Sequence, residues 1–182
     1  PRIAYRNFNR MDYAYQDASG WHSQFIYGYL RNDSYCSLAL DGDGYPHFSF
    51  YDELRILNDP VIGSLVYAYQ DAGGWHTEQV PDDTLTFSGL YTSIAVDEAG
   101  YPHISYYHSS RRDLKYAYQD RSGWHIETVD SENLVGAHTS LALDSDGYPH
   151  ISYFYCGDPS SCDAYDLRYA YRDAGSWHIE TV

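Results

Sequence analysis

The sequence predicts an all-β fold, a β-propeller of four four-stranded antiparallel blades, each about fifty residues long. Three observations predict it. A Tyr-Ala-Tyr motif recurs four times, a Trp-His pair follows each copy, and the segments between them alternate apolar and polar residues with the period of two that is typical of strands. Tyrosine, of which the chain has 22, favours strands because its ring packs while its hydroxyl stays hydrogen-bonded.

The repeat is defined by three signatures. The motif Tyr-Ala-Tyr-Gln-Asp, with Arg for Gln in the last copy, occupies residues 13–17, 67–71, 116–120 and 169–173, so that its copies start 54, 49 and 53 residues apart. The Trp-His pairs keep these spacings, at Trp21-His22, Trp75-His76, Trp124-His125 and Trp177-His178. A Tyr-Pro-His signature lies between them, at residues 45–47, 101–103 and 148–150. Four aligned copies indicate tandem repetition of one structural unit.

Each complete unit is predicted to hold four strands, here named A to D in chain order. In the third unit they cover residues 92–97, 103–107, 114–119 and 124–129. The A–B and C–D connections are tight turns that end at Gly100 and Gly123, where glycine tolerates a positive φ. The B–C and D–A loops differ between units and emerge at the same end of the blades. We therefore expect this variable end to carry the binding function.

The four units are predicted to span about residues 1–29, 30–83, 84–130 and 131–182. Residues 1–5 align with residues 102–106, so the first unit begins at strand B and the chain should contain fifteen strands. Three arrangements fit this phase. They are a part of a longer propeller, a four-bladed ring with one incomplete blade, and a ring completed by self-association of two chains.

The charge of the chain excludes two classes of partner. Its formal net charge is −15, from 11 Lys and Arg against 26 Asp and Glu, and such a field repels nucleic acids and anionic lipids. No apolar run approaches the ~20 residues of a membrane-spanning helix, so we expect no membrane insertion.

The cysteines indicate the compartment. Cys156 and Cys162 bracket a short Gly-Asp-Pro-Ser-Ser loop, which would let their sulfurs meet in a disulfide. We therefore expect an oxidising location, either extracellular, periplasmic or at the cell surface. Cys36 occupies the position of Thr92 and Thr139 in the other units, and we expect it to be a small buried thiol.

Most residues that could carry chemistry belong to the repeat. Asp41, Asp97 and Asp144 are expected to cap their own A–B turns, with Ca²⁺ binding as the alternative; otherwise no metal or cofactor is expected. The repeated histidines are expected to form one hydrogen bond or ring contact per blade, because equivalent residues point apart unless they reach the axis. The tryptophans are expected to fill the space between blades, with a platform for stacking sugar rings as the alternative.

Residues 140–153, Ser-Leu-Ala-Leu-Asp-Ser-Asp-Gly-Tyr-Pro-His-Ile-Ser-Tyr, carry a family resemblance. A small apolar strand ends in Asp, a turn with Gly follows, and a second strand begins; this pattern resembles the blades of NHL-type propellers. The Asp-turn-Gly element is similar, more distantly, to the Asp-box of sialidase-like propellers. The resemblance implies the propeller fold and assigns no activity.

The residues that break the repeat are the candidates for ligand binding. His108 and His138 depart from the histidine pattern, and the remaining candidates lie in or beside the variable loops. The full set is Asp52, Glu53, Arg55, His108, Arg111, Arg112, His138, Tyr155 and Tyr165.

Three functions fit these candidates. The first is a non-catalytic binding or scaffold module for a protein or carbohydrate ligand, which the near-identity of the units favours. The second is a lectin-like propeller with one weak sugar site per blade. The third is a propeller lyase or glycoside hydrolase with carboxylates near the axis. No nucleophile or metalloprotease motif is present, and we expect a binding protein rather than an enzyme.

Overall fold

The computed structural model describes residues 1–28, 35–54, 62–82, 88–158, 160–161 and 165–182. These residues form fifteen strands in four antiparallel sheets, one sheet per predicted unit. The first sheet contains β1 (Arg2–Asn7), β2 (Arg10–Asp17) and β3 (Gly20–Gly28). The second contains β4 (Cys36–Leu40), β5 (Pro46–Leu54), β6 (Ile62–Asp71) and β7 (Gly74–Gln79).

The other two sheets repeat the same order. The third contains β8 (Ser88–Val96), β9 (Pro102–His108), β10 (Asp113–Asp120) and β11 (Gly123–Asp130). The fourth contains β12 (Leu134–Leu143), β13 (Pro149–Cys156), β14 (Asp166–Arg172) and β15 (Trp177–Thr181). Each sheet is a simple meander of neighbouring strands, and the first lacks strand A, as predicted. The four predicted strands of the third unit are confirmed, although β8 begins four residues earlier, at Ser88, and pairs through two register shifts.

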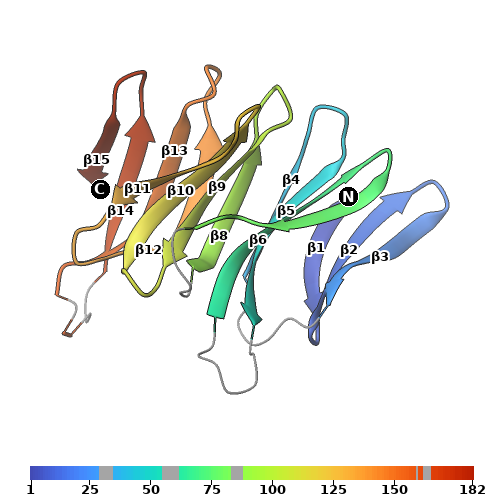
Figure 1. The fold of residues 1–182 in the computed structure, drawn as a ribbon, viewed down its shortest axis with the longest axis horizontal. Coiled ribbons are helices and arrows are strands. Elements are labelled where there is room, and N and C mark those ends of the chain that lie inside the picture. Colours follow the sequence, from blue (N-terminus) through green and yellow to red (C-terminus); the bar gives the residue numbers. More distant parts are fainter. Residues whose placement is uncertain (29–34, 55–61, 83–87, 159, 162–164) are drawn as a thin grey trace.

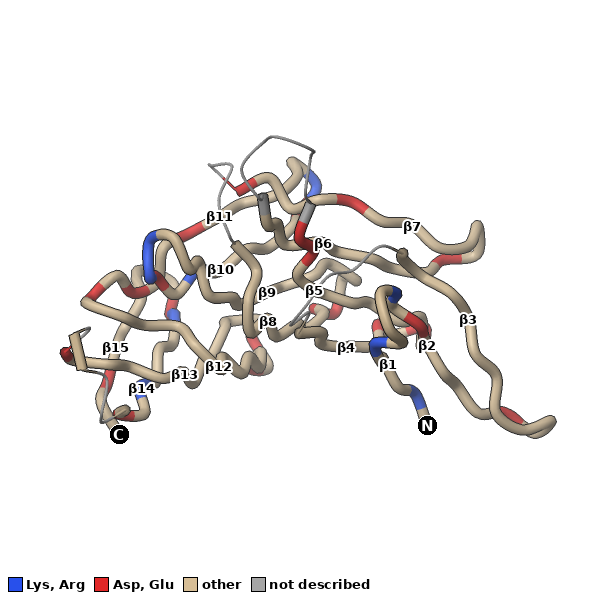
Figure 2. The backbone as a smooth tube through the Cα atoms, turned by 90° about the horizontal axis from the view of Figure 1, so that it is seen from below, with Lys and Arg blue, Asp and Glu red and all other residues tan. Residues whose placement is uncertain are grey.

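The sheets lie side by side in an arc, with β1–β3 at one end and β12–β15 at the other (Figures 1 and 2). The A strands β4, β8 and β12 are neighbours on the inner side of the arc, and β8 lies between the other two. The first and fourth sheets are at opposite ends, so the described residues form an open arc and not a closed four-bladed ring.

The hydrophobic core lies between adjacent sheets. Each of three clusters combines strand C and D residues of one unit with strand B residues of the next; one of them joins Leu65 and Val80 to Ile104. At each boundary a tryptophan packs edge-on against a tyrosine of the preceding unit, as Trp177 does on Tyr116 with ring centroids 5.3 Å apart. The predicted role of tryptophan between blades is thus confirmed for Trp75, Trp124 and Trp177.

The inner strands are joined by serine hydroxyls. Ser37 Oγ accepts a hydrogen bond from the backbone N–H of Ile94 at 3.1 Å, and Ser93 Oγ accepts one from Leu141 at 3.0 Å. Because these bonds link A strands of different units, they hold neighbouring sheets in register at the axis.

The repeated histidines and turn aspartates have the structural roles that the repeat predicts. His103 Nδ1 shares a hydrogen bond with the Tyr116 hydroxyl on the next strand, and the same pair recurs in the second and fourth units. Asp97 Oδ1 accepts the backbone N–H groups of Ala99 and Tyr101, which closes the A–B turn. The equivalent bonds at Asp41 and Asp144 confirm that these residues cap their own turns.

The cysteines are only partly described. Cys36 is half-buried at the start of β4, and burial raises the pKa of its thiol. Cys156 is fully buried at the end of β13. Its expected partner Cys162 lies outside the described residues, so the disulfide stays a prediction.

Candidate functional site

Aromatic rings from three units meet at the inner strands. Tyr35, Tyr91 and His138 hold the same position in their units, immediately before Cys36, Thr92 and Thr139. The ring centroids of Tyr35 and Tyr91 are 4.3 Å apart, and those of Tyr91 and His138 are 4.2 Å apart. Equivalent residues therefore converge here, because the A strands that carry them lie next to one another around the axis.

Two further rings extend this line. Phe154 on β13 lies 5.0 Å from His138, and Tyr165 lies 5.8 Å from Phe154, both measured between ring centroids. Together these five residues, Tyr35, Tyr91, His138, Phe154 and Tyr165, are called the axial aromatic row.

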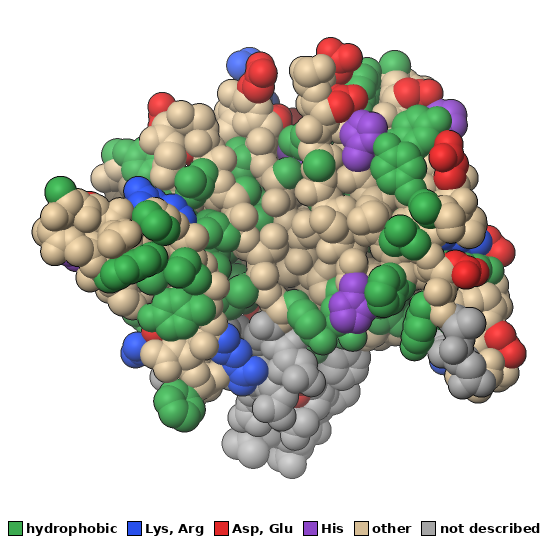
Figure 3. Space-filling view, turned by 180° about the vertical axis from the view of Figure 1, so that it is seen from behind, with side chains coloured by type: hydrophobic (Ala, Val, Ile, Leu, Met, Phe, Trp, Pro, Cys, Tyr) green, Lys and Arg blue, Asp and Glu red, His purple; other side chains and the backbone are tan. Residues whose placement is uncertain are grey.

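Four residues of the row are exposed to solvent, and Tyr91 is half-buried. Tyr35 and Phe154 are each 39% exposed and Tyr165 is 56% exposed, while His138 is also exposed. Figure 3, which shows the inner side of the arc, has hydrophobic side chains gathered together with histidine in the lower part of that face. Exposed aromatic rings gathered on one surface of a protein are typical of a surface that binds a ligand.

The backbone beneath the row is strained. Tyr91 and His138 have φ values of 53° and 54°, in the left-handed region that non-glycine residues rarely adopt. Two residues before them, Gly89 and Gly136 have φ values of 105° and 100°. A Cβ on Gly136 would lie 2.8 Å from Cα of Leu114 in the preceding unit. The chain therefore crosses its neighbour closely and turns sharply, which aims the two rings. Such strain is concentrated at functional sites.

The aromatic contacts continue from the row to Tyr107 on β9. The ring of Tyr107 is 6.2 Å from that of Tyr91. Burial raises the pKa of Tyr107, while the positive charge of Arg112 opposes this shift. Arg112 itself has a φ of 65°, and its carbonyl accepts the N–H of Val135 at 3.1 Å in the next unit. The site thus combines apolar ring faces with hydroxyl and imidazole groups.

Of the candidates named from the sequence, His138 and Tyr165 belong to the row and Arg112 lies near it. Arg111 is on the same loop and donates its backbone N–H to His108 Nδ1 at 3.2 Å. Glu53 is half-buried near the end of β5. Arg55 lies outside the described residues.

The other three candidates, Asp52, His108 and Tyr155, occupy one equivalent position at the end of strand B. Asp52 is buried and accepts the hydroxyl of Tyr27 at 2.8 Å. His108 is fully buried, with Nε2 3.9 Å from a carboxylate oxygen of Asp82. Each therefore has a partner in the preceding unit.

Tyr155 instead has its partners within its own unit. Its hydroxyl donates to Glu132 at 3.2 Å, and the guanidinium of Arg168 stacks 3.5 Å above its ring. Arg168 in turn donates to Asp130 at 2.8 Å in a buried pair. The Arg168–Asp130 pair joins the third and fourth units, so the divergence of this position has a structural explanation.

Sequence reasoning missed Tyr35, Tyr91 and Phe154. A signal was present, because the variable D–A connections at residues 31–35, 80–91 and 130–138 each end on an aromatic or histidine residue. Their convergence depends on the packing of the inner strands, which no local pattern contains.

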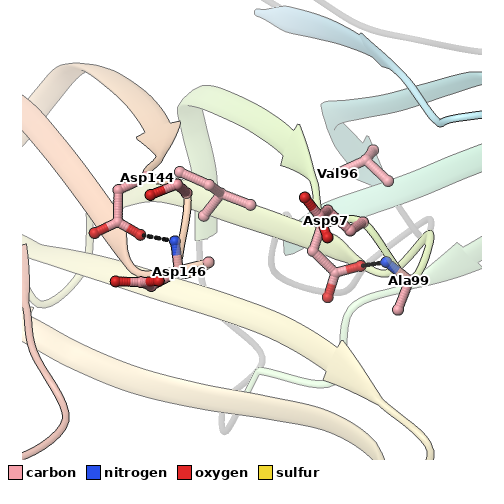
Figure 4. A pocket seen from close by; sticks show the side chains of 9 residues that line it. Val96, Asp97, Ala99, Asp144 and Asp146 are labelled. Carbon is pink, nitrogen blue, oxygen red and sulfur yellow. Dashed lines mark hydrogen bonds between the residues drawn. The ribbon is translucent and has the colours of Figure 1, made fainter.

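Apart from the axial aromatic row, a hollow of about 390 Å³ lies between the A–B turns of the third and fourth units (Figure 4). It is acidic, and Asp97 and Asp144 both face it. However, one oxygen of each carboxylate caps its turn and the other lies within 3.5 Å of His103 or His150. Within the described part of the chain, no group of three or more ligating side chains is placed to hold a metal ion.

No protein-family model and no curated protein sequence matches the chain. Solved structures do. A fucose lectin from Kordia zhangzhouensis, in complex with methyl-fucoside, matches with a TM-score of 0.51 and 18% identity over 80% of this chain and 97% of the lectin. A protein of unknown function from Dyadobacter fermentans matches with a TM-score of 0.59 and 11% identity, over 97% of this chain and 65% of that protein.

A thermostable family-43 glycoside hydrolase matches with a TM-score of 0.54 and 16% identity, over 98% of this chain and 73% of the hydrolase. At these identities the likeness establishes the fold alone, which is an all-β array of propeller blades. The resemblance to NHL-type propellers stays a prediction.

Proposed function

We propose that this chain is a non-catalytic carbohydrate-binding propeller that holds sugars at the axial aromatic row. The observation that carries the proposal is the contact of Tyr91 with both Tyr35 and His138, from three different units, on strained backbone. Strain at two adjacent, equivalent positions favours a role beyond folding.

The chemistry of the row suits sugars. The C–H faces of a pyranose ring pack against aromatic faces, and tyrosine and histidine supply polar edges for the sugar hydroxyls. The net charge of −15 favours neutral sugars over acidic ones.

The similarity to the Kordia lectin supports this proposal, because that protein binds methyl-fucoside and has a similar fold. It is support by analogy, since folds of this kind serve many functions. We accordingly propose binding of neutral sugars as a class and take methyl-fucoside as one probe.

An enzyme is the second candidate, and the hydrolase likeness favours it. Glycoside hydrolysis needs two carboxylates flanking the scissile bond, free to exchange protons. At the variable end, Asp52 holds the Tyr27 hydroxyl and Asp130 holds Tyr153 and Arg168. These bonds favour structural roles for both carboxylates, and so the binding proposal.

The location is part of the proposal. Among the described residues, no helix has the length and apolar character needed to cross a membrane. We propose a secreted or surface-attached protein, where free glycans are encountered.

The proposal is tested by screening the chain on a glycan array that includes fucosides. Wild type should bind a set of neutral glycans, and Tyr91→Gly and His138→Gly should weaken that binding about tenfold, the equivalent of one lost ring contact. Glycine keeps the backbone conformation while it removes the ring. Tyr148→Ala, which removes an aromatic side chain at an A–B turn, is the matched control and should bind like wild type.

Two results would overturn the proposal. One is the absence of binding to every sugar, which would favour a scaffold for protein ligands. The other is undiminished binding by both glycine variants, which would place the sugar elsewhere.

A further inference from the structure

The first and fourth sheets each leave one face uncovered, and the two faces are complementary. At the three internal boundaries, the strand B residues Phe48, Ile104 and Ile151 are all 0% exposed. The equivalent residue of the first unit, Ile3, is 46% exposed. The first sheet thus presents a face that is buried in every other unit.

The fourth sheet presents the opposite face. Its Leu167 is 43% exposed, whereas the equivalent Met11, Leu65 and Leu114 are 0% exposed. Val182 is 79% exposed, whereas its equivalents are 7% exposed or less; these are Ile26, Val80 and Val129. In each internal cluster, one residue from each of these two sets packs with the strand B residue of the next unit.

A polar contact marks the same boundaries. The indole N–H of Trp75 donates to Gln24 at 3.0 Å, and Trp124 and Trp177 donate to the equivalent Glu78 and Glu127 at 3.0 and 2.8 Å. Trp21 and Glu180 hold the donor and acceptor positions on the two uncovered faces. Trp21 is 54% exposed, and Glu180 is exposed.

The uncovered face of the first sheet is hollowed. The hollow measures about 440 Å³ and is lined by Ile3, Tyr5, Ala14, Trp21, His22 and Ser23. In the third unit, the residues equivalent to Ile3, Tyr5 and Ala14 are fully buried against the second unit. A neighbouring blade of the same repeat therefore has the right shape to cover it.

We propose that the chain associates head to tail with a second copy of itself, the first sheet of one copy packing on the fourth sheet of the other. Ile3 would pack on Leu167 and Val182, and the Trp21 indole would donate to Glu180, as happens three times within the chain. A second copy carries the matching apolar and polar positions together, and it is the occupant that we propose.

Such an interface is heterologous, with different faces meeting, and successive copies continue around the arc. Each copy carries a charge of −15, so the copies repel one another at low ionic strength. Salt should therefore strengthen the association, which is opposite to its effect on an interface formed by ion pairs.

The test is the mass of the 182-residue chain in solution, measured by sedimentation over a range of concentration and salt. The expected mass is a multiple, two or more, of 20.9 kDa, and it should rise with salt. A mass of 20.9 kDa at every concentration would overturn the proposal. That outcome is also the one expected if the faces are covered by further blades of a longer polypeptide or by another protein.

Surface variants test which faces meet. Trp21→Ala and Glu180→Lys change exposed side chains, so both should stay folded and both should shift the mass to that of one copy. A mixture of the two variants keeps one intact pairing, between Trp21 of one and Glu180 of the other, and should recover association. Glu180→Gln should associate like wild type, because Gln24 serves as the acceptor at an internal boundary.

Failure of the mixture to associate, when each variant is folded by circular dichroism, would contradict a head-to-tail interface. Association of both single variants at the wild-type mass would show that other surfaces meet, which also overturns the proposal. Neither result bears on sugar binding at the axial aromatic row, which is measured separately.

Discussion

The ring of His138 lies 4.2 Å from that of Tyr91, although the two residues come from different repeat units. They hold equivalent positions within the inner strands β8 and β12, each at a shift in the strand register. Equivalent positions on outer strands are kept apart by the intervening sheet, whereas those on inner strands meet at the axis (Figure 2). A repeat can therefore build a composite site from one residue per unit at this single position.

The close crossing beneath His138 should be intolerant of any side chain. Gly136→Ala places a Cβ 2.8 Å from the Leu114 backbone at a φ of 100°, so it should cost at least about 2 kcal/mol of unfolding free energy. Chemical denaturation measures this. Gly147→Ala is a useful comparison, since its φ is 83° but the space beside it is open, and it should cost less. Equal losses would show that φ alone is responsible.

The hydrogen bond between histidine and tyrosine in the second, third and fourth units should contribute to stability. Tyr116 is 1% exposed, and Tyr116→Phe leaves His103 Nδ1 without this partner in a buried site, which should cost about 1–3 kcal/mol. Tyr118→Phe, on the same strand and half-buried, should change stability by no more than about 0.5 kcal/mol. Comparable losses for both variants would contradict the role given to the His103–Tyr116 pair.

Stability should fall on mild acidification. Burial lowers the pKa of His47 and His103 in the folded state, so the unfolded chain takes up protons first. The two histidines contribute fully to the free energy of unfolding above the pKa of an unfolded histidine, about 6.5. This contribution is lost as the pH falls below that pKa. Thermal unfolding followed from about pH 7 to about pH 5 should show the decline. The double variant His47→Asn/His103→Asn should be less stable at pH 7 and flatter across this range, and an unchanged slope would argue against the two histidines.

Alkaline conditions should lower the stability of the fold by ionising its buried tyrosines. Burial raises the pKa of Tyr67, Tyr116 and Tyr153 far above the usual value of about 10. These phenols stay neutral in the folded state and ionise on unfolding. Their contribution to the free energy of unfolding is therefore fully present below about pH 10 and is lost as the pH rises above it. Ultraviolet titration should show one group of tyrosines ionising reversibly and a second group only with the loss of structure. A single transition at the normal pKa would contradict their burial.

The fold could be predicted because its determinants are local. Alternation in residues 114–119 and the turn glycine at Gly123 specify a hairpin within a few residues, and repetition multiplies that signal fourfold. The roles of the tryptophans, histidines and turn aspartates followed from their recurrence. A side chain present in every blade is best explained by a contact present in every blade.

The site could be predicted only in part, because residues differ between units for two reasons, namely ligand binding and local packing. Asp52, His108 and Tyr155 differ between units because each has its own partners. Those of Asp52 and His108 lie in the preceding unit, and those of Tyr155, Glu132 and Arg168, lie in its own unit. In a single sequence, a position that differs between units because its structural partner also differs cannot be told apart from a position that binds a ligand. Tyr91 is aromatic like so many residues of this chain, and only its backbone and its neighbours distinguish it.

The most direct test of sugar binding at the axial aromatic row is the imidazole resonance of His138 in NMR spectra. It is assigned by its loss in His138→Gly and followed as a bound sugar, such as methyl-fucoside, is added. This resonance should shift in a saturable manner. The resonances of the histidines that pair with C–D turn aspartates should stay in place; these are His22, His76, His125 and His178. A sugar that binds and moves the C–D turn histidines, but leaves His138 unmoved, would contradict sugar binding at the axial aromatic row.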